Sequence, residues 1–289
     1  MDARSWITLL LLALIWGSSF LLIKIGVAEI SPIWVVAART FAGSLFLLAL
    51  MRWRRESLPG RSLWPALVVV AFFNNVVPFT LIAWGELWIA SGVAAILNAT
   101  TPLFSVLIST SVGDERLSVP KVVGIVVGFV GVVVLIGAGV REFTQGLLGQ
   151  LAIVAASASY AIGALYVRRW LKGGRPIPLA TGQLLLATLM SLPFALLPAN
   201  LPQAMPSPLA VASITALGLL GSGLAYVLYY RLIAVVGATR TLLVTYLLPI
   251  TALFWGWLFL DETITVRTLL GMALIFSGIL LVNRERPLP

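Results

Sequence analysis

Apolar residues run along almost the whole chain in segments of about twenty, separated by short connections that hold Pro, Gly and charged residues. A helix rises 1.5 Å per residue, so about twenty residues cross the ~30 Å hydrocarbon core of a bilayer. Because a segment inside lipid must satisfy its own backbone hydrogen bonds, each segment is predicted to be a helix. The ten predicted spans are 5–25, 32–52, 63–84, 89–112, 119–138, 147–168, 177–198, 208–230, 238–260 and 265–283.

The composition supports this interpretation, since 60% of the residues are hydrophobic and only 10% are charged, against roughly 25% charged residues in a soluble domain. The net charge is +9, and the basic residues lie in the connections, where they favour contact with membrane lipid and argue against a nucleic-acid partner. The chain has no Cys and no His. Disulfides, zinc sites of these residues and His proton relays are thereby excluded, and no metal or cofactor is expected.

Lys and Arg are distributed unequally between the two sides of the predicted membrane domain. With a cytoplasmic N-terminus, fifteen of the nineteen fall on the cytoplasmic side, three fall outside, and Arg39 lies within a span. Cytoplasmic connections of membrane proteins carry this excess. The sequence therefore predicts a multi-pass protein of a bacterial inner membrane with both termini in the cytoplasm, and a first span that is retained rather than cleaved as a signal peptide.

The two halves of the chain resemble each other without a gap over a long stretch. At an offset of 147 residues a Pro, an Asp–Glu pair and two Gly recur, namely Pro102 with Pro249, Asp114-Glu115 with Asp261-Glu262, Gly124 with Gly271, and Gly131 with Gly278. Chance likeness between two hydrophobic stretches is the alternative. An odd number of helices in each repeat inverts the second one, and inverted repeats are typical of secondary transporters. We therefore predict an all-α membrane protein of two inverted five-helix repeats, 1–140 and 141–289, around a central cavity.

Specific motifs carry a resemblance to a known family. The stretch from Leu14 to Phe20 (LIWGSSF) with Lys24, and the two copies of Pro followed by Asp-Glu, resemble the drug/metabolite transporter superfamily in its ten-helix, EamA-type branch. Within this branch the chain is similar to the YddG aromatic amino acid and paraquat exporters. The resemblance implies export of amino acids and related metabolites by alternating access.

Polar, aromatic and helix-breaking residues gather in a few spans and are predicted to bind the substrate. Neutral amides, hydroxyls and carbonyls freed by Pro can bind an amino acid, and aromatic rings can stack on planar groups. Hydrogen bonding between helices and aromatic belts at the lipid headgroups are the alternatives. The candidates are Trp16, Phe20, Asn74, Pro78, Phe79, Asn98, Thr101, Tyr160, Tyr226, Thr245 and Tyr246.

Five charged residues are candidates for gating or charge pairing, namely Lys24, Arg39, Arg168, Glu115 and Glu262. Arg39 is either a clamp for a substrate carboxylate or a structural residue that pairs with backbone carbonyls, Glu29 or lipid phosphate; in the resembled family its helix is peripheral. Lys24 and Arg168 either gate or snorkel toward headgroups, and the two Glu residues either gate or lie in solvated turns. No carboxylate lies in the middle of a span, so facilitated transport or exchange is expected.

The sequence thus predicts a non-enzymatic secondary transporter that exports amino acids, aromatic or neutral ones, and related metabolites. A multidrug exporter of lipophilic planar cations is the alternative within this class, and a channel or an intramembrane enzyme are alternatives outside it. A monomer is expected. The GxxxG step of Gly124 and Gly128 packs helices within a repeat or, alternatively, pairs two copies of the chain.

Overall fold

A computed structural model describes residues 1–137, 145–241 and 243–283. Within these ranges every regular element is helical, and ten helices are long and apolar enough to cross a membrane. The ten predicted spans are confirmed, with ends shifted by a few residues. The predicted boundary between residues 140 and 141 lies outside the described residues. In chain order the ten spans are α1 (Ala3–Val27); α2 (Pro32–Trp53); α3 (Trp64–Ala71), η2 (Phe72–Val76) and α4 (Val77–Gly85); α5 (Ser91–Asn98) and α6 (Thr101–Ser111); α7 (Val119–Ile136); α8 (Gln145–Trp170); α9 (Pro176–Ala195); α10 (Pro208–Ala216), η4 (Leu217–Leu224) and α11 (Ala225–Val236); α12 (Ala238–Thr241) and α13 (Leu243–Leu260); and α14 (Val266–Asn283).

Two spans contain a wide π-helical turn that the hydrophobic pattern does not predict. The turns η2 and η4 interrupt the third and eighth spans, and an offset of 147 residues places Phe72–Val76 within the range of Leu217–Leu224. Such turns are rare and frequently mark functional sites.

The eighth span runs to Val236, six residues beyond its predicted end. It stops at Gly237, whose φ of 83° a residue with a side chain rarely adopts.

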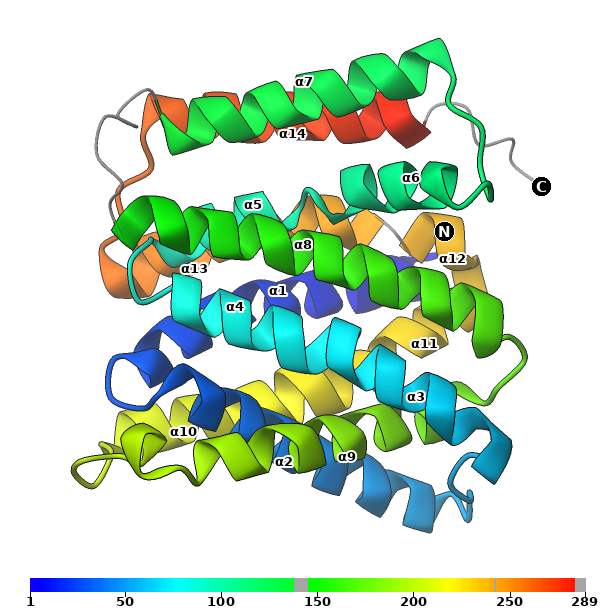
Figure 1. Cartoon of the computed structure of the whole chain (residues 1–289), viewed down its shortest axis with the longest axis vertical. Coiled ribbons are helices and arrows are strands. Elements are labelled where there is room, and N and C mark those ends of the chain that lie inside the picture. Colours follow the sequence, from blue (N-terminus) through cyan, green and yellow to red (C-terminus); the bar gives the residue numbers. More distant parts are fainter. Residues whose placement is uncertain (138–144, 242, 284–289) are drawn as a thin grey trace.

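Each contact between a helix of the first half and a helix of the second half has a counterpart contact in which the two halves swap roles (Figure 1). Helix α1 packs against α13, and its counterpart α8 packs against α6; likewise α2 packs against η4, and α9 packs against η2. Helices α7 and α14 lie side by side along one edge of the bundle. Each contact of one half with the other thus recurs with the halves exchanged, as a two-fold relation between them produces.

Glycines bring α7 and α14 into close contact. A side chain at Gly124 would meet the carbonyl oxygen of Gly278 at 2.6 Å, and one at Gly131 would meet the backbone nitrogen of Ile275 at 2.8 Å. The GxxxG step is therefore used inside one chain. Gly124 packs against α14 of the other half, whereas Gly128 also lies against Leu103 on α6 of the same repeat, so the predicted packing within a repeat accounts for part of these contacts.

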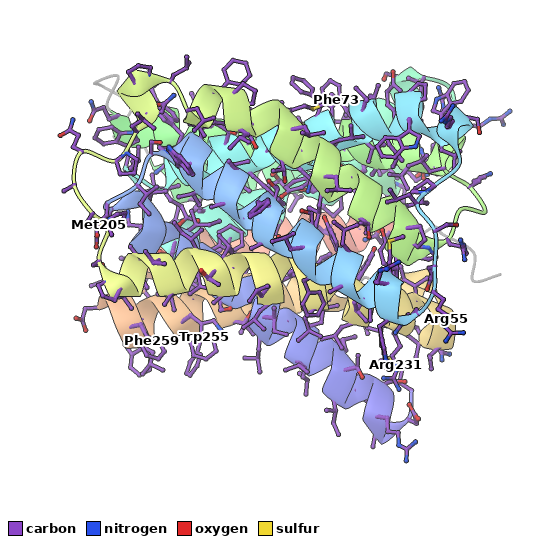
Figure 2. All side chains as sticks on the ribbon, turned by 90° about the horizontal axis from the view of Figure 1, so that it is seen from below. Arg55, Phe73, Met205, Arg231, Trp255 and Phe259 are labelled. Atoms are coloured by element: carbon purple, nitrogen blue, oxygen red, sulfur yellow. The ribbon has the colours of Figure 1, made fainter. Side chains whose placement is uncertain are left out.

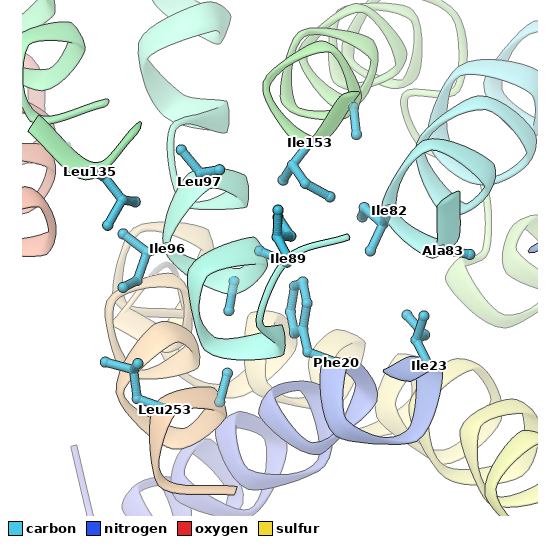
Figure 3. Close-up of a cluster of buried hydrophobic side chains, with 14 of the residues drawn as sticks. Phe20, Ile23, Ile82, Ala83, Ile89, Ile96, Leu97, Leu135, Ile153 and Leu253 are labelled. Atoms are coloured by element: carbon cyan, nitrogen blue, oxygen red, sulfur yellow. The ribbon is translucent and has the colours of Figure 1, made fainter. Parts of the chain in front are cut away.

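The ends of the bundle differ in charge, and its flanks are apolar. Arg55 and Arg231 lie together at one end in Figure 2, and Met205 lies at the other. Side chains such as Phe41 (53% exposed) and Trp257 (56% exposed) point away from the protein, as lipid-facing residues do. Inside, one large cluster of buried apolar residues joins α1, α4, α5, α8 and α13 (Figure 3).

Candidate functional site

Two hydrogen bonds between polar side chains lie in the interior and mirror each other. Arg39 on α2 donates from Nε to Oγ of Ser222 on η4 at 2.9 Å, and Gln183 on α9 donates from Nε2 to Oδ1 of Asn75 on η2 at 2.6 Å. Gln183 is the repeat counterpart of Arg39, and Ser222 is that of Asn75. All four side chains are buried. The π-helical turns therefore present one polar side chain each to the second helix of the opposite repeat.

Aromatic rings surround this polar centre. The guanidinium carbon of Arg39 lies 3.7 Å from the ring centroid of Phe79, within reach of a cation–π interaction. The ring of Tyr160 lies edge-on to that of Phe79, with 6.5 Å between the two ring centroids. The hydroxyl of Tyr226 lies 3.5 Å from Nδ2 of Asn75. Three predicted site residues, Phe79, Tyr160 and Tyr226, thus meet around Arg39.

Arg39 points into the bundle from a helix whose other side is exposed, at Phe41 and Leu45. Its side chain is 7% exposed, and it does not pair with Glu29, which instead accepts hydrogen bonds from the backbone nitrogen and hydroxyl of Ser207 at 2.6 Å each. Within the described part of the chain no acidic group forms an ion pair with Arg39. Among the described residues, the hydrogen-bond partner of this buried positive charge is the neutral Ser222, and the aromatic face of Phe79 lies against it.

The first helix contributes two further candidates near this centre. Trp16 donates from its indole nitrogen to the carbonyl oxygen of Gly221 on η4 at 3.1 Å and packs against Tyr229. Phe20 is 5% exposed and lies in the apolar cluster beside Ile89 (Figure 3). Trp16 thus contacts the π-helical turn of the opposite half, whereas Phe20 packs as a core residue.

The other candidates lie in varied surroundings. Asn74 lies against Gly163 on α8, where a side chain has no room, and Pro78 is buried in the first turn of α4. Thr101 donates to the carbonyl oxygen of Asn98 at 2.8 Å, and Oδ1 of Asn98 is buried without a hydrogen-bond partner within the described ranges. The remaining two lie on α13: Thr245 is partly buried, and the hydroxyl of Tyr246 accepts a hydrogen bond from Asn283 at 3.0 Å.

At one end of the bundle, two gating candidates hold the turn between α4 and α5, residues 85–92. Lys24 donates to the carbonyl oxygens of Glu86 and Ile89, the latter at 2.9 Å. Glu262 accepts from the backbone nitrogen and hydroxyl of Ser91 at 2.7 and 3.0 Å, and from the backbone nitrogen of Gly92 at 3.0 Å. A carboxylate is favourable at a helix N-terminus such as that of α5. We call this the Lys24 end.

At the opposite end the corresponding residues have different partners. Arg168 donates to Ser109 at 2.9 Å and lies 3.4 Å from Asp114, which Arg169 also contacts at 2.6 Å. The hydrogen bond from Arg169 holds the pKa of the Asp114 carboxyl below its usual range. Glu115, the counterpart of Glu262, pairs with Lys121 in the first turn of α7 at 2.8 Å. We call this the Arg168 end.

The sequence interpretation passed over one buried carboxylate. Glu86 lies in a connection between two spans, yet it is 0% exposed, and neither carboxylate oxygen has a hydrogen-bond partner among the described residues. Burial raises the pKa of this carboxyl well above its usual range; Lys24 and Arg39 lower it, and Glu262 raises it further. Glu86 follows directly after α4, so it is not in the middle of a span, yet its carboxylate is buried. The single hint in the sequence is that an acidic residue stands between closely spaced spans.

The residues that the structure describes include no group of three or more Asp and Glu side chains arranged to hold a metal ion. The polar centre around Arg39 offers one guanidinium, two amides and hydroxyls. These groups suit reversible binding of a small polar group. Comparison with known proteins fits this chemistry. The model of the EamA-like transporter family matches the chain twice, over residues 4–137 and 147–284. The chain belongs to the EamA-like transporter family. It is accordingly a multi-pass membrane transporter.

Relatives agree with this assignment over more than nine tenths of the chain, and a solved structure shares the fold. The chain is 28% identical to the uncharacterized transporter YoaV of Bacillus subtilis, with 92% of both chains covered. It is also 28% identical to an uncharacterized transporter of Archaeoglobus fulgidus (98% and 100% covered) and to the uncharacterized inner membrane transporter YedA of Escherichia coli (94% and 88% covered). One crystal structure of 19% identity matches with a TM-score of 0.68 over 98% of both chains, which shows the fold alone.

Proposed function

We propose that this transporter exports amino acids, aromatic or neutral ones, and related metabolites by alternating access. The observation that carries the proposal is the buried guanidinium of Arg39, which lies without an acidic partner among the described residues. Burying an uncompensated charge is costly. A substrate carboxylate would compensate it, and guanidinium groups bind carboxylates through paired hydrogen bonds.

The surroundings of Arg39 favour an aromatic or large neutral side chain on that substrate. Phe79, Tyr160 and Tyr226 supply ring faces and edges, and Gln183 and Asn75 supply neutral hydrogen-bonding groups. Rings of this kind stack with planar groups of the substrate. The same positive charge repels the lipophilic cations that the alternative function requires, which supports the similarity to aromatic amino acid exporters.

The difference between the two ends supports alternating access. At the Lys24 end, Lys24 and Glu262 hold the α4–α5 turn, where Ile89 is only 7% exposed. The counterpart of Ile89 is Val236, which is partly exposed, and the next residue, Gly237, has nothing within 4 Å of its side-chain position. The Lys24 end is thus the more tightly closed of the two.

The repeat relation then defines the opposite state. When the Lys24 end opens, Arg168 and Glu115 would leave Asp114 and Lys121 and hold the α11–α12 turn in the way that Lys24 and Glu262 now hold the α4–α5 turn. Inverted repeats that exchange conformations are the usual basis of alternating access. The charge pattern predicts that the Arg168 end faces the cytoplasm, so the described state faces inward, in an inner membrane like that of YedA.

Counterflow in proteoliposomes tests the substrate. Vesicles loaded with unlabelled aromatic amino acid should take up the labelled form faster than empty vesicles, and this uptake should saturate. Matched decarboxylated amines should compete poorly, because they lack the group that Arg39 binds. Arg39→Gln should remove this preference, whereas Arg55→Gln, at an exposed residue outside the spans, should keep it. Absence of counterflow with every amino acid, or better competition by amines and planar cations than by acids, would refute the proposal.

A further inference from the structure

The Lys24 end buries a carboxylate that the binding centre does not use. Glu86 is the residue at which α4 ends, and its side chain is completely covered when Lys24 and Glu262 hold the turn. A carboxylate at a helix C-terminus is disfavoured by the helix dipole. Lys24 donates to the carbonyl oxygens of Glu86 and Ile89, and among the described residues neither oxygen of the Glu86 carboxylate has a hydrogen-bond partner.

The charged groups around Glu86 come from three other elements. Lys24 on α1 and Arg39 on α2 are positive, and Glu262, in the connection between α13 and α14, is negative. Most of the residues packed against this turn are apolar. Ile89, for example, lies with Phe20 and Ile153 in the buried apolar cluster of Figure 3. A charged carboxylate without hydrogen bonds in such surroundings is strongly unfavourable. Taking up one proton removes that cost.

We propose that Glu86 is a proton-binding site that controls the Lys24 end, which closes when Glu86 carries a proton and opens when Glu86 loses it. A hydronium ion at the open end transfers a proton to a carboxylate oxygen and becomes water, so one O–H bond breaks and one forms. This inference takes from the proposed function one premise, namely that the Lys24 end opens and closes. It goes beyond facilitated exchange, since one step of the cycle then depends on pH.

The direction of the pH dependence follows from linkage. The closed state binds the proton more tightly than the open state, in which water reaches Glu86 and its pKa returns toward the ordinary value of about 4.3. Acid therefore favours closure, fully so below that ordinary value. As the pH rises above it, the ratio of open to closed protein increases by up to about tenfold per pH unit. The increase stops at the raised pKa of the closed state.

The distance between two spin labels across the Lys24 end tests the proposal. The chain contains no Cys, so Trp88→Cys and Ile264→Cys give unique labelling sites on the two connections that Glu262 joins, and both side chains are exposed, at 43% and 42%. The wild-type background should show a short distance at acid pH and a growing population of longer distances as the pH rises. Glu86→Gln, which mimics the protonated side chain, should keep the short distance at every pH.

Two further variants make every outcome decisive. Glu29→Gln changes an exposed carboxylate at the same end and should keep the wild-type response. Glu86→Asp keeps a titratable group and should show a response with a shifted midpoint, which serves if the Gln variant does not fold. A wild-type distance that ignores pH, or a Gln variant that responds as the wild type does, would overturn the proposal. The measurement needs no substrate, so a negative counterflow result would leave it standing.

Discussion

Removing the Glu262 carboxylate should open the Lys24 end. Glu262 accepts three hydrogen bonds, two from Ser91 and one from Gly92, at 2.7 to 3.0 Å. These bonds tie the connection before α14 to the first turn of α5, so they join the two halves of the chain. Glu262→Ala leaves two backbone N–H groups at the start of α5 without partners unless water reaches them.

The size of the effect follows from this bonding pattern. Hydrogen bonds to a charged group contribute about 1.5–3 kcal/mol each, although side-chain hydrogen bonds within membranes average only about 0.6 kcal/mol. Water partly replaces the lost bonds once the end opens. For three bonds these values sum to about 4.5–9 and about 2 kcal/mol, and we expect a net loss of about 2–4 kcal/mol, toward the lower sum. It corresponds to an increase of about 30- to 700-fold in the ratio of open to closed protein.

This ratio can be measured by backbone hydrogen exchange of the protein in detergent or nanodiscs, with mass spectrometry as the detection method. Peptides that cover residues 86–98 contain the amides of Ser91 and Gly92 and should exchange faster in Glu262→Ala by that factor. Gly256→Ala should act in the same direction but less strongly, because a side chain at Gly256 would overlap the Glu262 carboxylate.

The repeat supplies a matched control. Glu115→Ala removes the counterpart carboxylate, which pairs with Lys121 at the Arg168 end, and should leave exchange of residues 86–98 unchanged. If Glu262→Ala exchanges at the wild-type rate in these peptides, Glu262 does not hold the turn. If both variants accelerate exchange equally, the effect is general destabilisation.

Two other variants test the packing of the fold. Gly124→Val should lower the melting temperature in detergent, since the added side chain meets a carbonyl of α14 at 2.6 Å and overpacking costs about 1–3 kcal/mol, whereas Val126→Leu, at a 57% exposed position of the same helix, should not. Gln183→Leu should cost about 1–3 kcal/mol, because it leaves the buried amide of Asn75 without its 2.6 Å partner. Gln150→Leu, which removes an amide oxygen that has no hydrogen-bond partner within the described structure, should be neutral or stabilising. Equal melting temperatures for either pair of variants would contradict the corresponding contact.

The sequence alone determined the number of spans, because bilayer thickness fixes how long an apolar helix must be and each helix satisfies its own backbone. It also indicated the repeat, since Pro102 and Pro249 with their Asp–Glu pairs keep one spacing. These are local properties of the chain, and they can be counted without knowing which helices touch.

The tertiary structure decided which of the polar residues matter, because their environment depends on contacts between residues far apart in the chain. The sequence left the partners of Arg39 open, and only the structure places Ser222, 183 positions away, and Phe79 against it. Glu86 looked like a loop residue until Lys24 and Glu262 closed the turn over it. Whether a charge lies in water or in a low-dielectric interior depends on helix packing, and spacing along the chain does not encode that packing directly.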